Sequence, residues 1–333
     1  MGEAAADGAG GGASEGASSP GGASGGSSSR VNAAVPQARL PRLLGAAGRR
    51  VERVAKRVLL TGRARRVVAT LPEGLRPAAL WVLGDSASAA EEHLAERVEK
   101  TRARIARRRQ KITSYHSPLP GTFTTDAGGA AVPGPALAHQ ARAHAQTGSR
   151  PKKGILLQRL SAATGSQRIL ELGSNTGLSA SYLVSSPSVE LLLTIEGSPG
   201  LSAIARRTIA QFSDRFEVRN ALFDDALTAL SGEPPFDLAF IDGQHEGAAT
   251  LHYEERVRPL MRRDGGVVVF DDIYWSRDML AAWHTIVRSG AYALTVDLGS
   301  VGVGVLGETP SRHVDLMRYV GRPHVPRRVG DSI

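Results

Sequence analysis

The chain has 333 residues, of which 41% are hydrophobic, and it contains no cysteine. This length suits one large domain or one domain with an appendage, and the absence of cysteine excludes disulfides, thiolate metal sites and a thiol nucleophile. Residues 1–150 hold 22 Lys and Arg against 11 Asp and Glu, whereas residues 151–333 hold 19 against 21. No run of 18 apolar residues or secretory leader is visible, so we expect a cytoplasmic protein without a membrane span.

The N-terminal part of the chain divides into two predicted segments. Residues 1–35 are rich in Gly, Ala and Ser and are predicted to be a disordered tail. Residues 36–112 are predicted to be a basic helical extension, with one helix over 49–71 and a second that starts after Asp85 or Ser86 and runs to about Lys111. Its cationic end, 100–111, indicates either a solvated helix face or contact with a polyanion.

A connector follows, over residues 113–151. It is rich in Gly, Ala and Pro, and one helix is predicted near 135–146. Tyr115 and His116 lie in its first part, where they could form part of a lid over an active site.

From Lys152 onward, predicted helices and strands alternate, which indicates an α/β fold with helices on both faces of a mainly parallel sheet. The strands are predicted at 168–172, 190–196, 216–219, 236–242 and 265–271, with an antiparallel pair at 292–298 and 302–306. The helices are predicted at 155–164, 178–184, 199–212, 223–230, 246–260 and 276–289. This domain is assigned to residues 152–308, and residues 309–333 are predicted to be a basic surface tail.

A glycine turn follows the first strand of this domain, from Gly173 to Gly177. A strand, a glycine turn and a helix N-terminus suit a nucleotide-type ligand, because the backbone N–H groups of the turn are expected to face it. The turn lacks the Gly-x-Gly-x-x-Gly spacing of dinucleotide sites. Instead Glu171 precedes the first glycine by two residues, which gives Glu-x-Gly-x-x-x-Gly.

Carboxylates stand at or near the ends of four predicted strands, and parallel strands bring such ends to one edge of a sheet. They are Glu171, Glu196, Asp242 and Asp271, with Asp272 following. Like charges gathered in this way need a cation or hydrogen-bond donors nearby. Glu196 comes about 20 residues after the turn, where a carboxylate accepts ribose hydroxyls. Asp224 or Asp225 follows the third strand and could meet an adenine amino group or cap a helix.

The motifs in combination resemble a known family. Glu171-x-Gly173-x-x-x-Gly177 is joined by Phe240-Ile241-Asp242-Gly243-Gln244-His245 and Phe270-Asp271-Asp272-Ile273-Tyr274-Trp275-Ser276. Together they resemble the class I S-adenosylmethionine (SAM) dependent methyltransferases, in a bacterial group related to the metal-dependent O-methyltransferases of the catechol and caffeoyl-CoA type. The resemblance covers about residues 113–306. It implies a Rossmann-like seven-stranded sheet and methyl transfer from SAM, most readily to a hydroxyl of a small molecule.

The resemblance also implies roles for individual residues. The residues expected to bind SAM are Glu171, Gly173, Ser174, Asn175, Gly177, Glu196, Asp224 and Asp242. Asp242, Asp271 and Asp272 match the positions that bind a divalent cation, Mg²⁺ or Mn²⁺, in the metal-dependent enzymes. Asp242, His245 and Asp271 are the expected catalytic residues. This chain departs from the family pattern, because Gly243, Gln244 and His245 replace an acid-rich loop. A metal-free site with His245 as general base therefore remains an alternative.

Two other functions remain as alternatives to a small-molecule methyltransferase. The basic helices fit a methyltransferase acting on RNA or another macromolecule, although nucleic acid is not the favoured partner because no aromatic residues interleave with the charges. A nicotinamide-dependent Rossmann oxidoreductase is disfavoured by the missing third glycine. A homodimer is compatible with the sequence.

Overall fold

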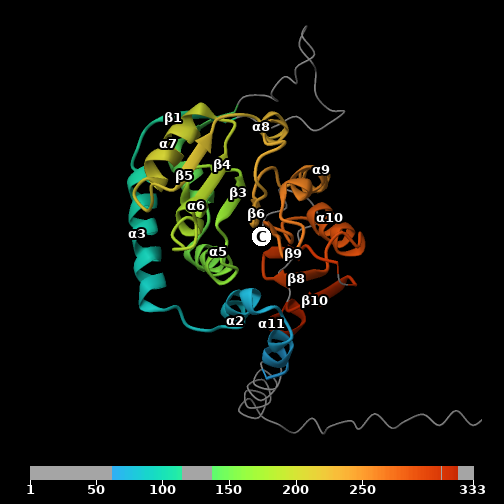
Figure 1. The fold of residues 1–333 in the computed structure, drawn as a ribbon. Helices are drawn as coiled ribbons and strands as arrows, with labels where there is room; N and C mark the ends of the chain where they lie inside the picture. The colour runs from blue at the N-terminus through green and yellow to red at the C-terminus, as the bar shows by residue number, and fades with distance from the viewer. Residues whose placement is uncertain (1–61, 115–136, 309, 322–333) are drawn as a thin grey trace, which may run out of the picture. The chain divides into compact units, whose positions relative to one another are not determined.

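The computed structural model describes residues 62–114, 137–308 and 310–321 (Figure 1). The predicted disordered tail, most of the helix over 49–71, the lid with Tyr115 and His116, and the chain after residue 321 lie outside the described residues. The first described residues, 62–69, are helical. No helix in these ranges is long and apolar enough to cross a membrane.

An eight-stranded sheet forms the centre of the domain, in the order β10-β8-β9-β7-β6-β3-β4-β5. Every neighbouring pair is parallel except those made by β9, which is antiparallel to β7 and β8. Its strands are β3 (Arg168–Leu172), β4 (Leu191–Ile195), β5 (Phe216–Arg219), β6 (Leu238–Ile241), β7 (Val267–Phe270), β8 (Leu294–Leu298), β9 (Val301–Val305) and β10 (Arg312–Asp315). The chain runs outward from β3 to β5 and then returns to β6, so the strand order reverses between β3 and β6. Ligands bind at such a switch point in open α/β sheets.

Helices cover both faces of the sheet (Figure 1). α5, α6 and α7 pack side by side as one group, and α8, α9 and α10 form the other. They are α5 (Pro151–Ala163), α6 (Leu178–Leu183), α7 (Pro199–Ile209), α8 (Phe223–Ala229), α9 (Gly247–Val257) and α10 (Arg277–Arg288), with the 3-10 turn η2 (Arg258–Leu260) after α9. β3, β4, β6 and β7 lie between these groups and are apolar runs that are almost wholly buried. The predicted Rossmann-like methyltransferase sheet is therefore confirmed.

The C-terminal segment corrects one expectation. Residues 310–321 were expected to be part of a basic surface tail, but they add β10 and the short helix α11 (Met317–Val320) to the domain. β10 pairs in parallel with β8, with Val314 opposite Val296. Leu316 and Met317 are buried against the core, so apolar burial holds this segment in place. The sheet therefore has one strand more than the seven predicted.

The helical extension also differs from its prediction. It comprises η1 (Glu73–Leu75), α2 (Arg76–Val82) and α3 (Ala89–Ala106). α3 begins after Ser88, because Ser88 and Glu91 form a reciprocal capping box, rather than after Asp85 or Ser86. It ends before the last cations, and Lys111 starts β1 (Lys111–Ser114), which pairs with β2 (Leu137–Gln140). β2 leads into α4 (Ala141–Thr147), so a strand and a short helix replace the helix predicted near 135–146.

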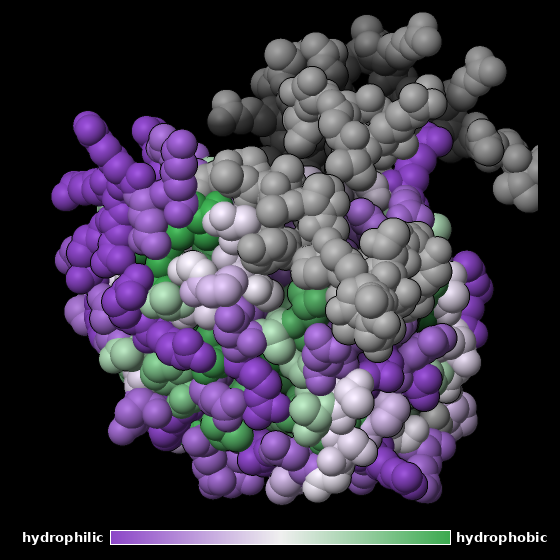
Figure 2. Space-filling model, turned by 90° about the horizontal axis from the view of Figure 1, so that it is seen from above, coloured by the Kyte–Doolittle hydropathy of each residue, from purple (hydrophilic) through white to green (hydrophobic). Residues whose placement is uncertain are grey.

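Several cations of α3 pack onto the domain. Arg97 donates to the carbonyl oxygen of Gln211 at 2.6 Å and lies over the ring of Phe212. The buried Arg102 donates to the carbonyl oxygens of Ala145, Gly148 and Ser149. These arginines therefore stabilise the protein itself, which reduces the cationic surface left for a polyanion. Hydrophilic side chains nevertheless cover much of the face in Figure 2.

Candidate active site

The glycine turn after β3 packs tightly against the end of β6. Gly173 has φ +100°, and a Cβ atom there would lie 2.2 Å from the carbonyl oxygen of Asp242, so only glycine fits. The amides of Gly173 and Ser174 both donate to the carbonyl oxygen of Ile195, and the amide of Asn175 donates to Glu196 Oε2 at 2.8 Å. The expectation that the amides of this turn face a ligand is therefore wrong for these three. These three amides connect the turn after β3 to the end of β4. The small glycine residues let the turn pack closely and leave space for the cavity beside it.

A cavity of about 290 Å³ opens beside this turn. Its lining comes from α4 and the loop after it, the glycine turn with the start of α6, the end of β4, the helices α7 and α8, and the loop after β6. Of the predicted site residues it brings together Gly173, Ser174, Asn175, Glu196, Asp242 and His245. Glu171, Gly177, Asp224, Asp271 and Asp272 are absent from its lining. His144, Thr147, Gly148, Ser149, Phe223 and Gln244 line it as well and were missed by sequence reasoning.

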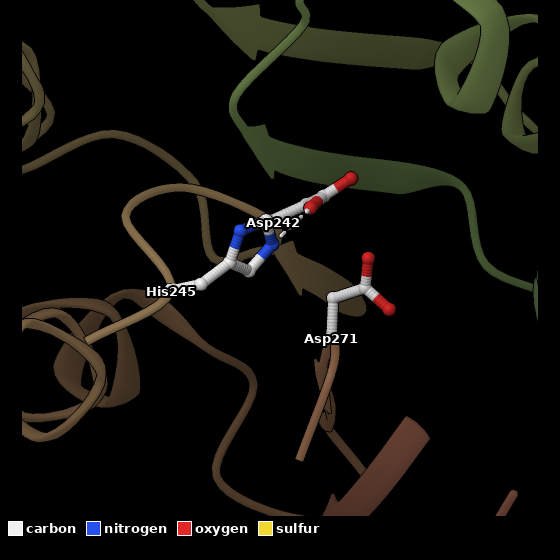
Figure 3. Close-up of side chains that lie close together, drawn as sticks. All are labelled: Asp242, His245 and Asp271. Atoms are coloured by element: carbon white, nitrogen blue, oxygen red, sulfur yellow. Dashed lines mark ion pairs between the residues drawn. The ribbon is translucent and has the colours of Figure 1, made fainter. Parts of the chain in front are cut away.

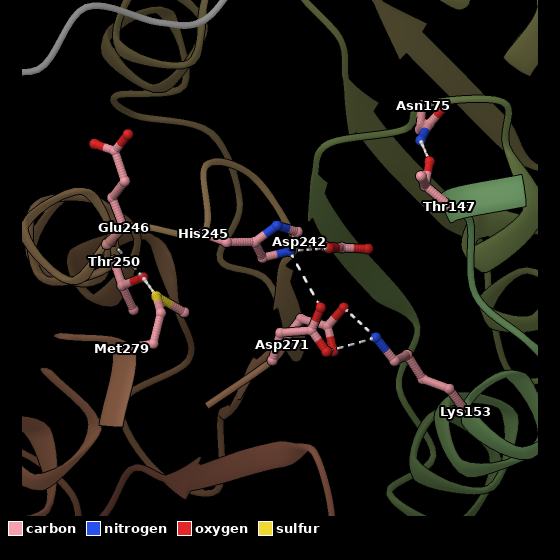
Figure 4. Close-up of polar contacts among 10 residues, drawn as sticks. Thr147, Lys153, Asn175, Asp242, His245, Glu246, Thr250, Asp271 and Met279 are labelled. Carbon is pink, nitrogen blue, oxygen red and sulfur yellow. Dashed lines mark hydrogen bonds and ion pairs between the residues drawn. The ribbon is translucent and has the colours of Figure 1, made fainter. Parts of the chain in front are cut away.

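Buried polar atoms in this lining lack protein partners among the described residues. They are Ser149 Oγ, Asn175 Oδ1 and Thr176 Oγ1. Buried polar groups are nearly always paired, so unpaired ones gathered at one cavity indicate a polar ligand or water. The side-chain amide of Asn175 also donates to Thr147 Oγ1 at 3.4 Å (Figure 4), which links the turn to the end of α4.

Two carboxylates at the ends of β3 and β4 lie in different environments. Glu196 lines the cavity, and its oxygens accept hydrogen bonds from the amides of Asn175 and Ser198. Burial nevertheless raises its pKa to about 7. Glu171 is fully buried behind the turn, where Thr194 Oγ1 donates to its Oε2 at 2.5 Å. Burial raises the pKa of Glu171 to about 7 as well.

Asp224 is held away from the cavity. Its Oδ1 lies 2.7 Å from Nε2 of His252 and 3.7 Å from Nε of Arg256, both on α9. The neighbouring Phe223 lines the cavity instead, because consecutive residues of α8 point in different directions. The structure therefore does not bring Asp224 together with the other predicted cofactor residues.

A cluster of acids and one histidine lies at the ends of β6 and β7 (Figure 3). One ligand atom from each of Asp242, His245 and Asp271 lies within 4.8 Å of the other two. His245 Nε2 is 3.4 Å from Asp242 Oδ1 and 3.4 Å from Asp272 Oδ2. Burial by itself would lower the pKa of His245, but the adjoining Asp242 carboxylate raises it above the usual value. The ring of the exposed Trp275 lies 5.4 Å from the His245 ring and covers one side of the cluster.

Lys153 enters the same cluster from α5 (Figure 4). Its Nζ lies 2.6 Å from Asp271 Oδ2 and 3.1 Å from Asp272 Oδ1. The neighbouring Gly154 lets α5 pack closely against α6, because a Cβ at Gly154 would lie 2.2 Å from the ring of Tyr182. This close packing sets the position of Lys153. Sequence reasoning missed Lys153. The available signal was a lysine pair in the first turn of a helix, where the helix dipole disfavours cations.

Backbone strain is concentrated at this edge of the sheet. Among the described residues, positive φ angles outside glycine occur at Asn175, Gln244 and Asp272. Each follows the end of a different strand, β3, β6 or β7. Such conformations cost of order 1–3 kcal/mol each and persist where the surroundings hold them, as at ligand sites.

The predicted three-aspartate metal site fits poorly with this arrangement. Asp242, His245 and Asp271 could span a cation, and Asp271 Oδ1 is buried without a hydrogen-bond partner among the described residues. However, the Lys153 ammonium already contacts Asp271 and Asp272. A divalent cation on the same carboxylates would be repelled by it, and Mg²⁺ prefers oxygen ligands to imidazole. The ammonium of Lys153 therefore compensates Asp271 and Asp272 in this structure.

The strand order and the cavity at the switch point define a Rossmann-like α/β domain with a candidate ligand site at the carboxyl edge of its sheet. The sequence of residues 170–273 matches a family model described as a methyltransferase domain. The chain therefore contains a methyltransferase domain, in agreement with the resemblance. A comparison with curated proteins gave no match.

Solved structures of similar proteins include three methyltransferases. An O-methyltransferase from Bacillus cereus, in complex with SAH, is 27% identical over 47% of this chain and 82% of its own, with a TM-score of 0.41. TomG from Streptomyces achromogenes, an O-methyltransferase in complex with SAM, is 22% identical over 48% of this chain and 82% of its own, with a TM-score of 0.40. The methyltransferase PaMTH1 from Podospora anserina is 15% identical over 81% of this chain and 100% of its own, with a TM-score of 0.46.

Proposed function

We propose that residues 152–308 transfer the methyl group of SAM to a hydroxyl oxygen of a small molecule. The observation that carries this proposal is the contact between two features: the cavity beside Glu196 and the cluster of Asp242, His245 and Asp271. Asp242 and His245 belong to both. A cofactor in the cavity would therefore present its reactive end to a cluster able to take up a proton.

The chemical groups that line the cavity are of the types that SAM would need for binding. Glu196 offers a carboxylate to ribose hydroxyls, and Ser149, Asn175 and Thr176 offer unpaired polar atoms. A pyrophosphate would need free backbone amides at the turn, but those of Gly173 and Ser174 are used by Ile195. This argues against the nicotinamide alternative.

The protein's part in the reaction is to hold the acceptor and receive its proton. When bound, SAM supplies a methyl group on a sulfonium, and the C–S bond breaks as the acceptor oxygen bonds to the methyl carbon, leaving neutral S-adenosylhomocysteine. His245 takes the hydroxyl proton, and the imidazolium so formed lies 3.4 Å from Asp242 and Asp272, which stabilise its charge. Holding the two reactants in line is worth roughly 7–11 kcal/mol.

The macromolecular alternative is not favoured, because Arg97, Arg102 and Arg104 of α3 are engaged with the domain itself. These three arginines therefore contribute to the stability of the domain and are not available to bind nucleic acid.

Calorimetry with SAM, with SAH and with NAD tests the proposal on the full chain in EDTA. We expect SAM and SAH to bind and NAD to give no heat. Asp224→Asn, outside the cavity, should bind SAM like the wild type, whereas Asn175→Ala should bind it more weakly. Absence of SAM binding would refute the proposed function. A methyl-transfer assay with His245→Asn, which should bind SAM normally and turn over at least 100-fold more slowly, separates the cofactor step from the chemistry.

A further inference from the structure

A second cavity, of about 400 Å³, lies among elements outside residues 170–273. It is formed by the end of α2, the start of α5, the turn between β8 and β9, and α11. Its lining residues are Trp81, Val82, Arg150, Lys152, Lys153, Leu156, Leu298, Gly299, Ser300, Met317, Val320 and Gly321. It shares none of these with the cavity beside Glu196.

This second cavity adjoins the acid cluster. Lys153 lines it, and the ammonium of the same residue contacts Asp271 and Asp272. Ser300 also lines it, and its carbonyl oxygen accepts from the amide of Ile273, which directly follows Asp272. The cluster therefore lies between the two cavities, with Asp242 lining the first and Lys153 the second.

Apolar side chains from three helices and a strand end make up much of the wall. Leu156 and Met317 are buried, whereas Val320 is 46% exposed. The indole of Trp81 is fixed in place, because its Nε1 donates to the carbonyl oxygen of Lys152 at 2.8 Å and Arg159 lies over the ring. A rigid aromatic wall of this kind suits an apolar ligand body.

The charges of the lining are all positive. Lys153 is neutralised by Asp271 and Asp272. Arg150 and Lys152 are exposed and make no ion pair with any described residue, and no carboxylate belongs to the lining. Two cations are therefore left for a ligand at the mouth of an apolar cavity. A neutral ligand would leave them unused.

We propose that this cavity binds the methyl acceptor, and that the acceptor is an amphipathic hydroxy acid. Its apolar body lies against Trp81 and Leu156, and its anionic group pairs with Arg150 and Lys152. Its hydroxyl extends past Lys153 into the acid cluster, where His245 takes its proton. This inference rests on the proposed function, because it assigns the substrate class of the same site.

Matched acid and ester pairs test the charge requirement on the full chain with SAH bound. The probes are a hydroxybenzoate, a hydroxycinnamate and a hydroxylated fatty acid, each compared by calorimetry with its methyl ester. We expect at least one acid to bind at least tenfold more tightly than its ester at low salt. Arg150→Gln combined with Lys152→Gln should abolish that preference, whereas Arg263→Gln, an exposed cation elsewhere, should preserve it. Val82→Trp should weaken both members of the pair by filling the cavity.

The outcomes separate the two proposals. Normal SAH binding, together with equal affinity for acid and ester or no binding of any probe, overturns the acceptor proposal and leaves the methyltransferase assignment in place. A preference for the acid that survives the double substitution also overturns it. Failure to bind SAH and SAM refutes the proposed function itself. Circular dichroism of each variant, with retained SAH affinity, shows that the substituted proteins are folded.

Discussion

The ammonium of Lys153 lies 2.6 Å from Oδ2 of Asp271, although 118 residues separate them in the sequence. Burial by itself would lower the pKa of Lys153, but Asp271, Asp242 and Asp272 together raise it. Asp271 experiences the reverse: burial and the neighbouring Asp242 raise its pKa to about 7, against the effect of Lys153. A positive charge from Lys153 therefore lies beside two of the three carboxylates that the sequence predicts as metal ligands.

Lys153→Met should uncover divalent cation binding. Removing the ammonium leaves Asp271 and Asp272 without their lysine partner, so the affinity for Mn²⁺ should rise at least tenfold, which corresponds to about 1.4 kcal/mol. Titration of Mn²⁺ followed by electron paramagnetic resonance measures this, with Lys152→Met as the control next in sequence. Wild-type protein that binds Mn²⁺ tightly, with no change in Lys153→Met, would contradict the metal-free site. Methyl transfer by the wild type should also be insensitive to EDTA.

The affinity for SAM should rise with pH through about 7. Glu196 must be ionised to accept ribose hydroxyls, and burial raises its pKa to about 7 in the free protein. Each pH unit below that value should therefore weaken binding about tenfold, with a plateau above pH 8. Calorimetry between pH 5.5 and 8.5 measures the profile, and Glu196→Gln should bind weakly with a flatter profile. A wild-type affinity that is constant over this range would remove Glu196 from the ribose site.

Glu171→Gln should stabilise the free protein more at pH 8 than at pH 5.5. Because the folded-state pKa of Glu171 is raised from 4.5 to about 7, its contribution to stability is fully present below pH 4.5 and is lost as the pH rises through about 7. The neutral glutamine keeps an acceptor for Thr194 and avoids that loss, which is worth at most roughly 3 kcal/mol. Urea unfolding at both pH values measures the difference. The exposed Glu255→Gln serves as the matched control. Equal effects of Glu171→Gln at both pH values would show that Glu171 is not a buried titrating group.

Arg102→Met should destabilise the protein and weaken SAM binding together. Arg102 is buried and donates to the carbonyl oxygens of Ala145, Gly148 and Ser149, and the last two residues line the cavity beside Glu196. Leaving these oxygens unpaired should cost roughly 3 kcal/mol. Chemical unfolding and SAM calorimetry report the two effects, with the exposed Arg107→Met as control. A variant that is destabilised but binds SAM normally would separate Arg102 from the site.

Seven of the eight strands of the sheet, the glycine turn and most of the strand-end acids could be predicted from the sequence alone. Buried parallel strands are continuous apolar runs, and an acid after such a run falls at the carboxyl edge whatever the rest of the chain does. For this reason Glu196, Asp242 and His245 could be placed at one cavity in advance. The neighbouring Asp224 could not, because the orientation of a short helix decides which of two adjacent residues points inward.

The ion pairs of the acid cluster and the second cavity could not be predicted, because they depend on contacts between distant segments of the folded chain. Lys153 reaches Asp271 because Gly154 allows α5 to approach Tyr182 closely, and no local pattern encodes that contact. The loop near Ser149 depends on Arg102 of α3, and the second cavity requires α2, α5 and α11 to meet. Such contacts join segments far apart in the chain, and their partners are chosen by packing rather than by periodicity.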